Sequence, residues 1–129
     1  MTEHAPLAFV YDRCASRAHI DVDMRLTGCH AYADGMGWVL AGGGPWLDRG
    51  PDALTHHRPQ LAAMLDRMRV EAARREVLCL VHSWGRLATD HTHRFVFQQR
   101  IIEAGGWSVT TFGESDRDSV RALLVGRQS

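Results

Sequence analysis

The sequence contains no lysine. Its fifteen basic residues are all arginine, and fifteen acidic residues balance them to a formal net charge of zero at pH 7. Domains that bind DNA tightly by themselves are usually clearly basic. The neutral balance therefore argues against tight nucleic-acid binding by this chain alone. The use of arginine at every basic position fits a codon bias and indicates no mechanism.

Cysteines and long apolar runs are also scarce. Cys14, Cys29 and Cys79 are an odd number without the spacing of a metal site, which predicts reduced, mostly buried thiols. No apolar run approaches the roughly 20 residues that a membrane span needs, and the first residues lack the basic and apolar segments of a secretory signal. We therefore expect a cytoplasmic protein that has no membrane partner and needs no cofactor.

The chain does contain alternating strand and helix patterns. Its 129 residues, 45% of them hydrophobic, suffice for a single domain with a buried core, which we place at 1–129. Such alternation predicts a three-layer α/β/α fold with a four-stranded, mostly parallel sheet. The expected strands are Leu7–Tyr11, Trp38–Ala41, Val77–Val81 and Trp107–Phe112. The expected helices are Ala18–Gly35, one that begins at Pro59, His91–Ala104 and a short one within Glu114–Gly126.

The segment Gly42–Arg58 is rich in glycine and proline, and we expect a flexible loop over the edge of the sheet. Its GGGP run is not a phosphate-binding P-loop, because the Gly-Lys-Ser/Thr that such a loop requires is absent. The helix that begins at Pro59 carries several arginines. They predict a solvated face, with a phosphate-facing patch as the alternative.

Polar residues follow the first expected strand directly. Open α/β sheets place their chemistry outside the carboxyl ends of the strands, and here Arg13, Cys14, Ser16 and Arg17 gather at such an end. Two flanking arginines lower the pKa of a thiol if they converge on it. Burial in the core is nevertheless the favoured interpretation of Cys14.

Four short motifs stand in order along the chain: Tyr11–Ser16, Cys29–Ala33 with Gly37-Trp38, Arg58–Leu61 and Ser83–Asp90. Together they resemble the N-terminal catalytic domain of serine recombinases, the resolvase/invertase family, over roughly Leu7–Phe112. The first motif stands where the family carries Tyr-x-Arg-Val-Ser on its first strand. The resemblance implies a resolvase-like fold with the strand order 2-1-3-4.

The chain departs from that family at positions that carry its chemistry. In the family, the serine after the Val position attacks a DNA phosphate and forms a phosphoserine bond. That position is Ala15 here, and alanine has no nucleophilic atom. The acid of the last motif is replaced by Gly85, and the second arginine of that motif is replaced by Thr89. The resemblance therefore implies a catalytically degenerate domain, a pseudoenzyme rather than an enzyme.

Three arginines remain at positions that match the family, namely Arg13, Arg58 and Arg86. If they gather at the carboxyl edge of the sheet, they can hold a phosphate or sulfate through charge-assisted hydrogen bonds. We therefore predict an interaction or regulatory module that binds an anion or a nucleic-acid phosphate. The alternative is that nearby carboxylates hold each arginine instead: Asp12, Asp48 and Asp90.

An active enzyme is the first alternative function. In this interpretation the chain is a site-specific recombinase that transfers DNA strands with Ser16 as its nucleophile. Neighbouring residues on an extended segment point to opposite faces. Ser16 therefore needs a one-residue bulge to reach the position that the family's serine occupies.

A metal- or small-molecule-binding module is the second alternative, because the chain holds eight histidines. His91 and His93 are two residues apart and do not share a helix face. No His-Glu-x-x-His or Cys-x-x-Cys motif accompanies them. We therefore predict solvated or hydrogen-bonded histidines and no metal site.

The end of the chain is short compared with the family. Family members carry a long helix after the fourth strand, which packs across a dimer, and then a DNA-binding domain. We expect this chain to lack both. Val120, Leu123 and Leu124 form a brief apolar helical face, which predicts a homodimer contact.

Overall fold

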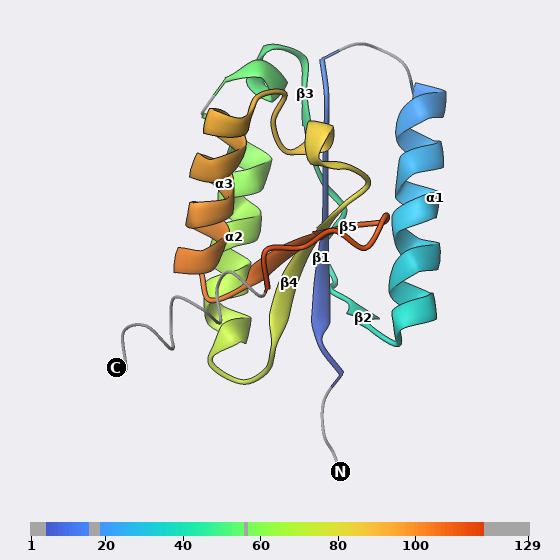
Figure 1. Ribbon diagram of the computed structural model, residues 1–129, viewed down its shortest axis with the longest axis vertical. Coiled ribbons are helices and arrows are strands. Elements are labelled where there is room, and N and C mark those ends of the chain that lie inside the picture. The colour runs from blue at the N-terminus through green and yellow to red at the C-terminus, as the bar shows by residue number, and fades with distance from the viewer. Residues whose placement is uncertain (1–4, 16–18, 56, 118–129) are drawn as a thin grey trace.

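The computed structural model describes residues 5–15, 19–55 and 57–117, and it confirms the three-layer α/β/α fold. A parallel sheet lies between α1 on one face and α2 with α3 on the other (Figure 1). The strands are β1 Leu7–Cys14, β2 Val39–Leu40, β3 Trp46–Arg49, β4 Val77–Val81 and β5 Trp107–Thr110. The helices are α1 His19–Met36, α2 Pro59–Ala72 and α3 His91–Glu103, with two short 3-10 helices, η1 Gly50–Leu54 and η2 Trp84–Arg86.

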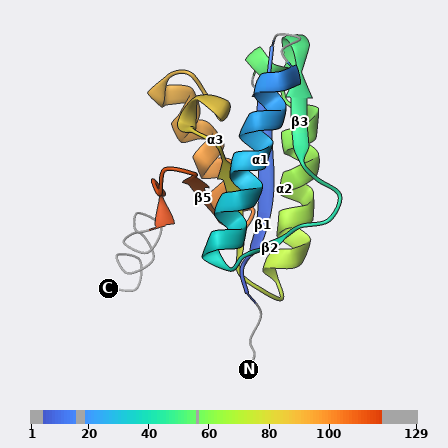
Figure 2. The same cartoon turned by 90° about the vertical axis from the view of Figure 1, so that its right-hand side faces the viewer.

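The central strand β1 is buried along its whole length. Successive side chains of a strand point to opposite faces. Phe9 and Tyr11 accordingly pack into the core beneath α2 and α3, whereas Ala8 and Val10 pack beneath α1. Figure 2 shows α1 in front of β1 and α2 behind it. Coverage on both faces explains why β1 begins with an uninterrupted apolar run.

The expectation of a flexible loop over Gly42–Arg58 was wrong, and so was the count of four strands. The sheet has five strands: β2, β1, β4 and β5 lie in that order, and β3 also pairs with β1. The short β2 reaches only Leu7 and Ala8, and β3 then pairs in parallel with Tyr11–Cys14. The second half of β1 therefore obtains its backbone hydrogen bonds from a segment that local composition marked as a loop.

Pro59 begins α2, as the sequence predicted. Its buried stripe consists of Leu61, Met64, Leu65 and Met68. Two exposed ion pairs lie on its outer surface and at its end: Arg69 pairs with Asp66 at 2.7 Å, and Arg74, in the turn after α2, pairs with Glu71 at 3.0 Å. These pairs agree with the expected solvated face.

The residues after β5 cover its outer edge. The Thr110 amide donates to the Glu114 carbonyl, and the Asp116 amide donates to the Ser108 carbonyl. The residues predicted to form a homodimer contact, Val120, Leu123 and Leu124, lie outside the described residues. In the described part of the chain, no helix combines the length and apolar character that a membrane crossing requires.

Candidate functional site

Arg13 clamps three segments together at the carboxyl end of β1. Its side chain is buried, and its guanidinium donates to the Gly85 carbonyl from Nε at 3.0 Å and from Nη2 at 2.8 Å. It also donates to the Ala53 carbonyl at 2.9 Å and to the Thr89 hydroxyl at 2.8 Å. Arg13 therefore joins β1 to η1 and to the turn around η2.

Arg58 lies deeper, directly before α2. It is 3% exposed and donates from Nε to the Thr55 carbonyl at 3.0 Å and from Nη1 to the Leu87 carbonyl. The central carbon of its guanidinium lies 4.0 Å from the centroid of the Phe97 ring, which is within the range of a cation–π contact. These contacts make Arg58 a supporting residue behind the site.

Arg86 is the most accessible of the three predicted arginines, with 29% of its side chain exposed. Its Nη1 donates to the Arg13 carbonyl at 3.1 Å. Its Nε lies 4.0 Å from Oδ1 of Asp12. The side chain is thus loosely paired and partly open to solvent.

A hollow of about 220 Å³ opens at this end of the sheet. Its lining combines two arginines with small and polar residues: Arg13, Ala15, Ala53, Leu54, Arg86 and Thr89. The structure thus brings Arg13 and Arg86 together at one hollow and places Arg58 behind it. Anion binding by these three residues stays a prediction.

The positive charges of Arg58 and Arg86 act electrostatically on Arg13. Burial, followed by the positive charges of Arg58 and Arg86, lowers the pKa of Arg13 below its usual value. The main-chain carbonyls around Arg13 and Arg58 accept their hydrogen bonds without supplying a full negative charge. The cluster therefore keeps an excess of positive charge.

Two of the carboxylates that were expected to hold the arginines have other partners. Asp48 accepts the Tyr11 hydroxyl at 2.8 Å and the backbone amides of Gln60 and Leu61 at the start of α2. Asp90 caps α3 by accepting the His93 amide at 2.8 Å, and this hydrogen bond lowers the pKa of Asp90. That part of the alternative was wrong, because both carboxylates satisfy helix N-termini instead.

The third carboxylate, Asp12, does belong to the cluster. It is 2% exposed, and its Oδ2 accepts the Arg25 Nε of α1 at 2.9 Å. Sequence reasoning missed Arg25, because the contact depends on how α1 is placed over the sheet. It also missed the hydrogen bond from Arg13 to Thr89, because Thr89 was considered only as the residue that replaces an arginine of the last motif.

The other candidate residues at the carboxyl end of β1 differ in their exposure. Ala15 is exposed and lines the hollow, where it presents a methyl group. Ser16 and Arg17 lie outside the described residues. Cys14 is buried, as are Cys29 and Cys79, which confirms the expectation of buried thiols. Burial, with a smaller contribution from the charge of Asp12, raises the pKa of Cys29 to about 12.

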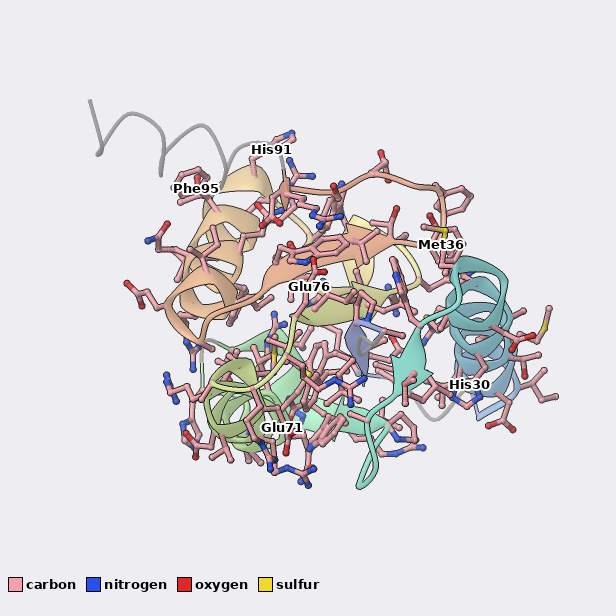
Figure 3. All side chains as sticks on the ribbon, turned by 90° about the horizontal axis from the view of Figure 1, so that it is seen from below. His30, Met36, Glu71, Glu76, His91 and Phe95 are labelled. Carbon is pink, nitrogen blue, oxygen red and sulfur yellow. The ribbon has the colours of Figure 1, made fainter. Side chains whose placement is uncertain are left out.

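The histidines do not assemble into a metal centre in the described part of the chain. No group of three or more His, Cys, Asp or Glu residues there has the geometry to hold a metal ion. Figure 3 shows His30 beside α1 and His91 beside α3, on opposite sides of the sheet.

Three solved structures that share this architecture are serine-recombinase catalytic domains. The N-terminal catalytic domain of TP901-1 integrase matches with a TM-score of 0.67 and 14% identity, over 95% of this chain and 96% of that chain. A resolvase family site-specific recombinase from Streptococcus pneumoniae also matches with a TM-score of 0.67 and 14% identity, over 96% of this chain and 88% of that chain. The C-terminal catalytic domain of ISC1926 TnpA, an IS607-like serine recombinase, matches with a TM-score of 0.65 and 17% identity, over 92% of this chain and 78% of that chain.

The chain has the fold of a serine-recombinase catalytic domain. No family model and no curated protein sequence matches it. The recombinase-like fold therefore emerges from the structure and from short motifs, whereas overall sequence similarity is low. The hollow of Arg13, Ala15 and Arg86 lies where the first strand ends, at the position of the family-like Tyr11–Ser16 motif.

Proposed function

We propose that this recombinase-like domain binds a phosphate-type anion, free or on a nucleic acid, in the hollow of Arg13 and Arg86, and that it does not cleave DNA. In this role it is an interaction or regulatory module. The proposal separates binding, for which charged groups are present, from bond cleavage, for which the family's reacting groups are replaced.

The excess of positive charge carries the binding half of the proposal. Four guanidinium groups surround the end of β1, those of Arg13, Arg25, Arg58 and Arg86. Among the described residues, Asp12 is the carboxylate that forms ion pairs with this group, through Arg25 and Arg86. Buried charge without a counter-ion is costly, so an anion in the hollow is favoured. Phosphate and sulfate oxygens suit arginine donors geometrically.

The replaced residues support the second part of the proposal, that the domain does not cleave DNA. A methyl group at Ala15 cannot attack phosphorus, and Gly85 offers a backbone carbonyl, already bonded to Arg13, in place of a carboxyl. Phosphoryl transfer needs a nucleophile as well as positioned cations. The chain retains the cations and lacks the hydroxyl at this position.

Calorimetric titration with inorganic phosphate at low ionic strength tests the binding. We expect Arg86→Gln to weaken binding at least about tenfold, which corresponds to about 1.4 kcal/mol. Arg69→Gln is the matched control, because Arg69 is exposed on α2 and pairs with Asp66. Equal affinity of the unmodified chain and Arg86→Gln contradicts the proposed site. The same titration with a duplex oligonucleotide compares a free anion with a nucleic-acid phosphate.

A denaturing gel with a labelled duplex tests the absence of cleavage. We expect no covalent protein–DNA adduct from the unmodified chain. An adduct that Ser16→Ala abolishes establishes the active recombinase with Ser16 as its nucleophile and overturns the proposed loss of catalysis.

We also propose that the chain forms a homodimer. The apolar residues at the end of the chain support this association, together with Phe95 on the outer side of α3, which is 70% exposed (Figure 3). Light scattering over a range of protein concentrations tests it. A monomer throughout that range contradicts it.

A further inference from the structure

We propose that Asp12 is an internal counter-ion that competes with a bound anion for Arg86, and that Arg25 limits this competition by holding part of the Asp12 charge. The inference concerns the regulation of the hollow and rests on the proposed anion binding there. It assigns opposite effects to two residues that form an ion pair with each other.

Asp12 lies where three positively polarised groups converge. Its Oδ1 accepts the Arg13 amide at 2.8 Å and lies 4.0 Å from the Arg86 Nε. Its Oδ2 accepts the Arg25 Nε at 2.9 Å. The carboxylate is 2% exposed, so solvent screens these interactions weakly. Asp12 therefore faces the hollow's accessible arginine on one side and α1 on the other.

The contact between Asp12 and Arg86 is long enough to be adjustable. At 4.0 Å it stands at the limit of an ion pair, whereas the contact with Arg25 has the length of a hydrogen bond. Arg86 is also the more exposed of the two arginines, at 29% against 18%. An anion in the hollow and the Asp12 carboxylate thus attract the same partly exposed guanidinium.

Arg25 determines how much of the carboxylate's charge acts on Arg86. It approaches from α1, outside the hollow, and its Nη2 is buried and has no hydrogen-bond partner among the described residues. Arg25 therefore contributes positive charge to Asp12 and does not line the hollow of Arg13 and Arg86. Removal of Arg25 leaves Arg86 as the remaining ion-pair partner of Asp12 among the described residues.

The two variants should consequently change anion affinity in opposite directions. Asp12→Asn removes the competing charge in a side chain of the same size, and we expect it to tighten phosphate binding about tenfold, within the usual range of site coupling. Arg25→Gln concentrates the Asp12 charge on Arg86, and we expect it to weaken phosphate binding by a similar factor. Arg69→Gln again serves as the control for loss of a surface arginine.

Calorimetric titration with inorganic phosphate on the full chain tests the inference. Arg86→Gln should abolish the effect of Asp12→Asn, because the competition acts through Arg86. This dependence distinguishes competition from a general structural change, and far-ultraviolet circular dichroism verifies that each variant is folded. If Asp12→Asn does not fold, the weaker binding expected of Arg25→Gln decides the inference by itself.

The outcomes separate the inference from the proposed function. Phosphate binding by the unmodified chain with equal affinity in Asp12→Asn and Arg25→Gln overturns the inference and leaves the proposed function intact. Binding that appears only in Asp12→Asn supports the inference and shows that the unmodified chain is held in a non-binding state. Absence of binding in the unmodified chain and in every folded variant overturns both.

Discussion

The guanidinium of Arg13 donates two hydrogen bonds to the carbonyl of Gly85, at 3.0 Å from Nε and at 2.8 Å from Nη2. In the resembled family the position of Gly85 carries an acid. Here the backbone carbonyl of this residue accepts the arginine, and among the described residues no carboxylate hydrogen-bonds to the Arg13 guanidinium. The contact joins β1 to η2 through a carbonyl acceptor that carries no full negative charge.

Arg13→Met should destabilise the fold strongly, because it leaves the buried carbonyl of Ala53 and the half-buried carbonyl of Gly85 without their donor. An unsatisfied buried group costs about 1–3 kcal/mol. We therefore expect the free energy of unfolding in urea to fall by about 3 kcal/mol. The exposed Arg69→Met variant should change it by less than about 0.5 kcal/mol. Similar losses in both variants are incompatible with a clamping role for Arg13.

Gly85→Asp should weaken phosphate binding while the fold is preserved. A Cβ at Gly85 meets only the Ser83 Oγ within 4 Å, at 3.8 Å, so the substitution fits sterically. The added carboxylate lies next to Arg13 and Arg86 and reduces the excess positive charge. We expect about a tenfold loss of affinity, about 1.4 kcal/mol, by calorimetric titration. Gly85→Ala is the matched control, and equal affinity in the two variants contradicts the electrostatic argument.

Local patterns sufficed for most of the architecture. The buried stripe of α2 repeats at helical spacing, and β4 is a short apolar run between polar segments, so both were predicted from the sequence. The strand β3 was not predicted, because Trp46–Arg49 follows a Gly/Pro-rich run and is half polar. Its pairing with β1 is a long-range contact that no local pattern encodes.

The candidate site, like the fold, could be predicted from local sequence patterns only in part. Three arginines were singled out by their places in motifs, yet their separate roles depend on tertiary contacts. Phe97 lies on α3, far from Arg58 in sequence, and its ring under the guanidinium places Arg58 inside the core. The ion pair between Asp12 and Arg25 requires a particular rotation of α1. Composition and spacing carry no information about either contact.

Asp48→Asn should loosen the start of α2. Its two carboxylate oxygens accept the Gln60 and Leu61 amides and the Tyr11 hydroxyl. An asparagine has one acceptor oxygen in their place and lacks the negative charge that favours a helix N-terminus. We expect a loss of about 2 kcal/mol in the free energy of unfolding. The exposed Asp66→Asn is the control, and a loss of equal size there would count against the buried contact.

Stability should decrease in alkaline solution through the buried thiols. Burial raises the pKa of Cys29 from 9.0 to about 12, and it also raises the pKa of Cys79. Above pH 9 the unfolded chain therefore loses thiol protons that the native chain retains, so the native state binds more protons and the free energy of unfolding falls as pH rises from 9 to 12. Each thiol contributes a slope of about 1.4 kcal/mol per pH unit. Urea unfolding under reducing conditions at pH 8, 9 and 10 measures this slope, and Cys29→Ala should reduce it by one thiol's share. An unchanged slope in that variant, despite a folded structure at pH 8, contradicts a buried, protonated Cys29.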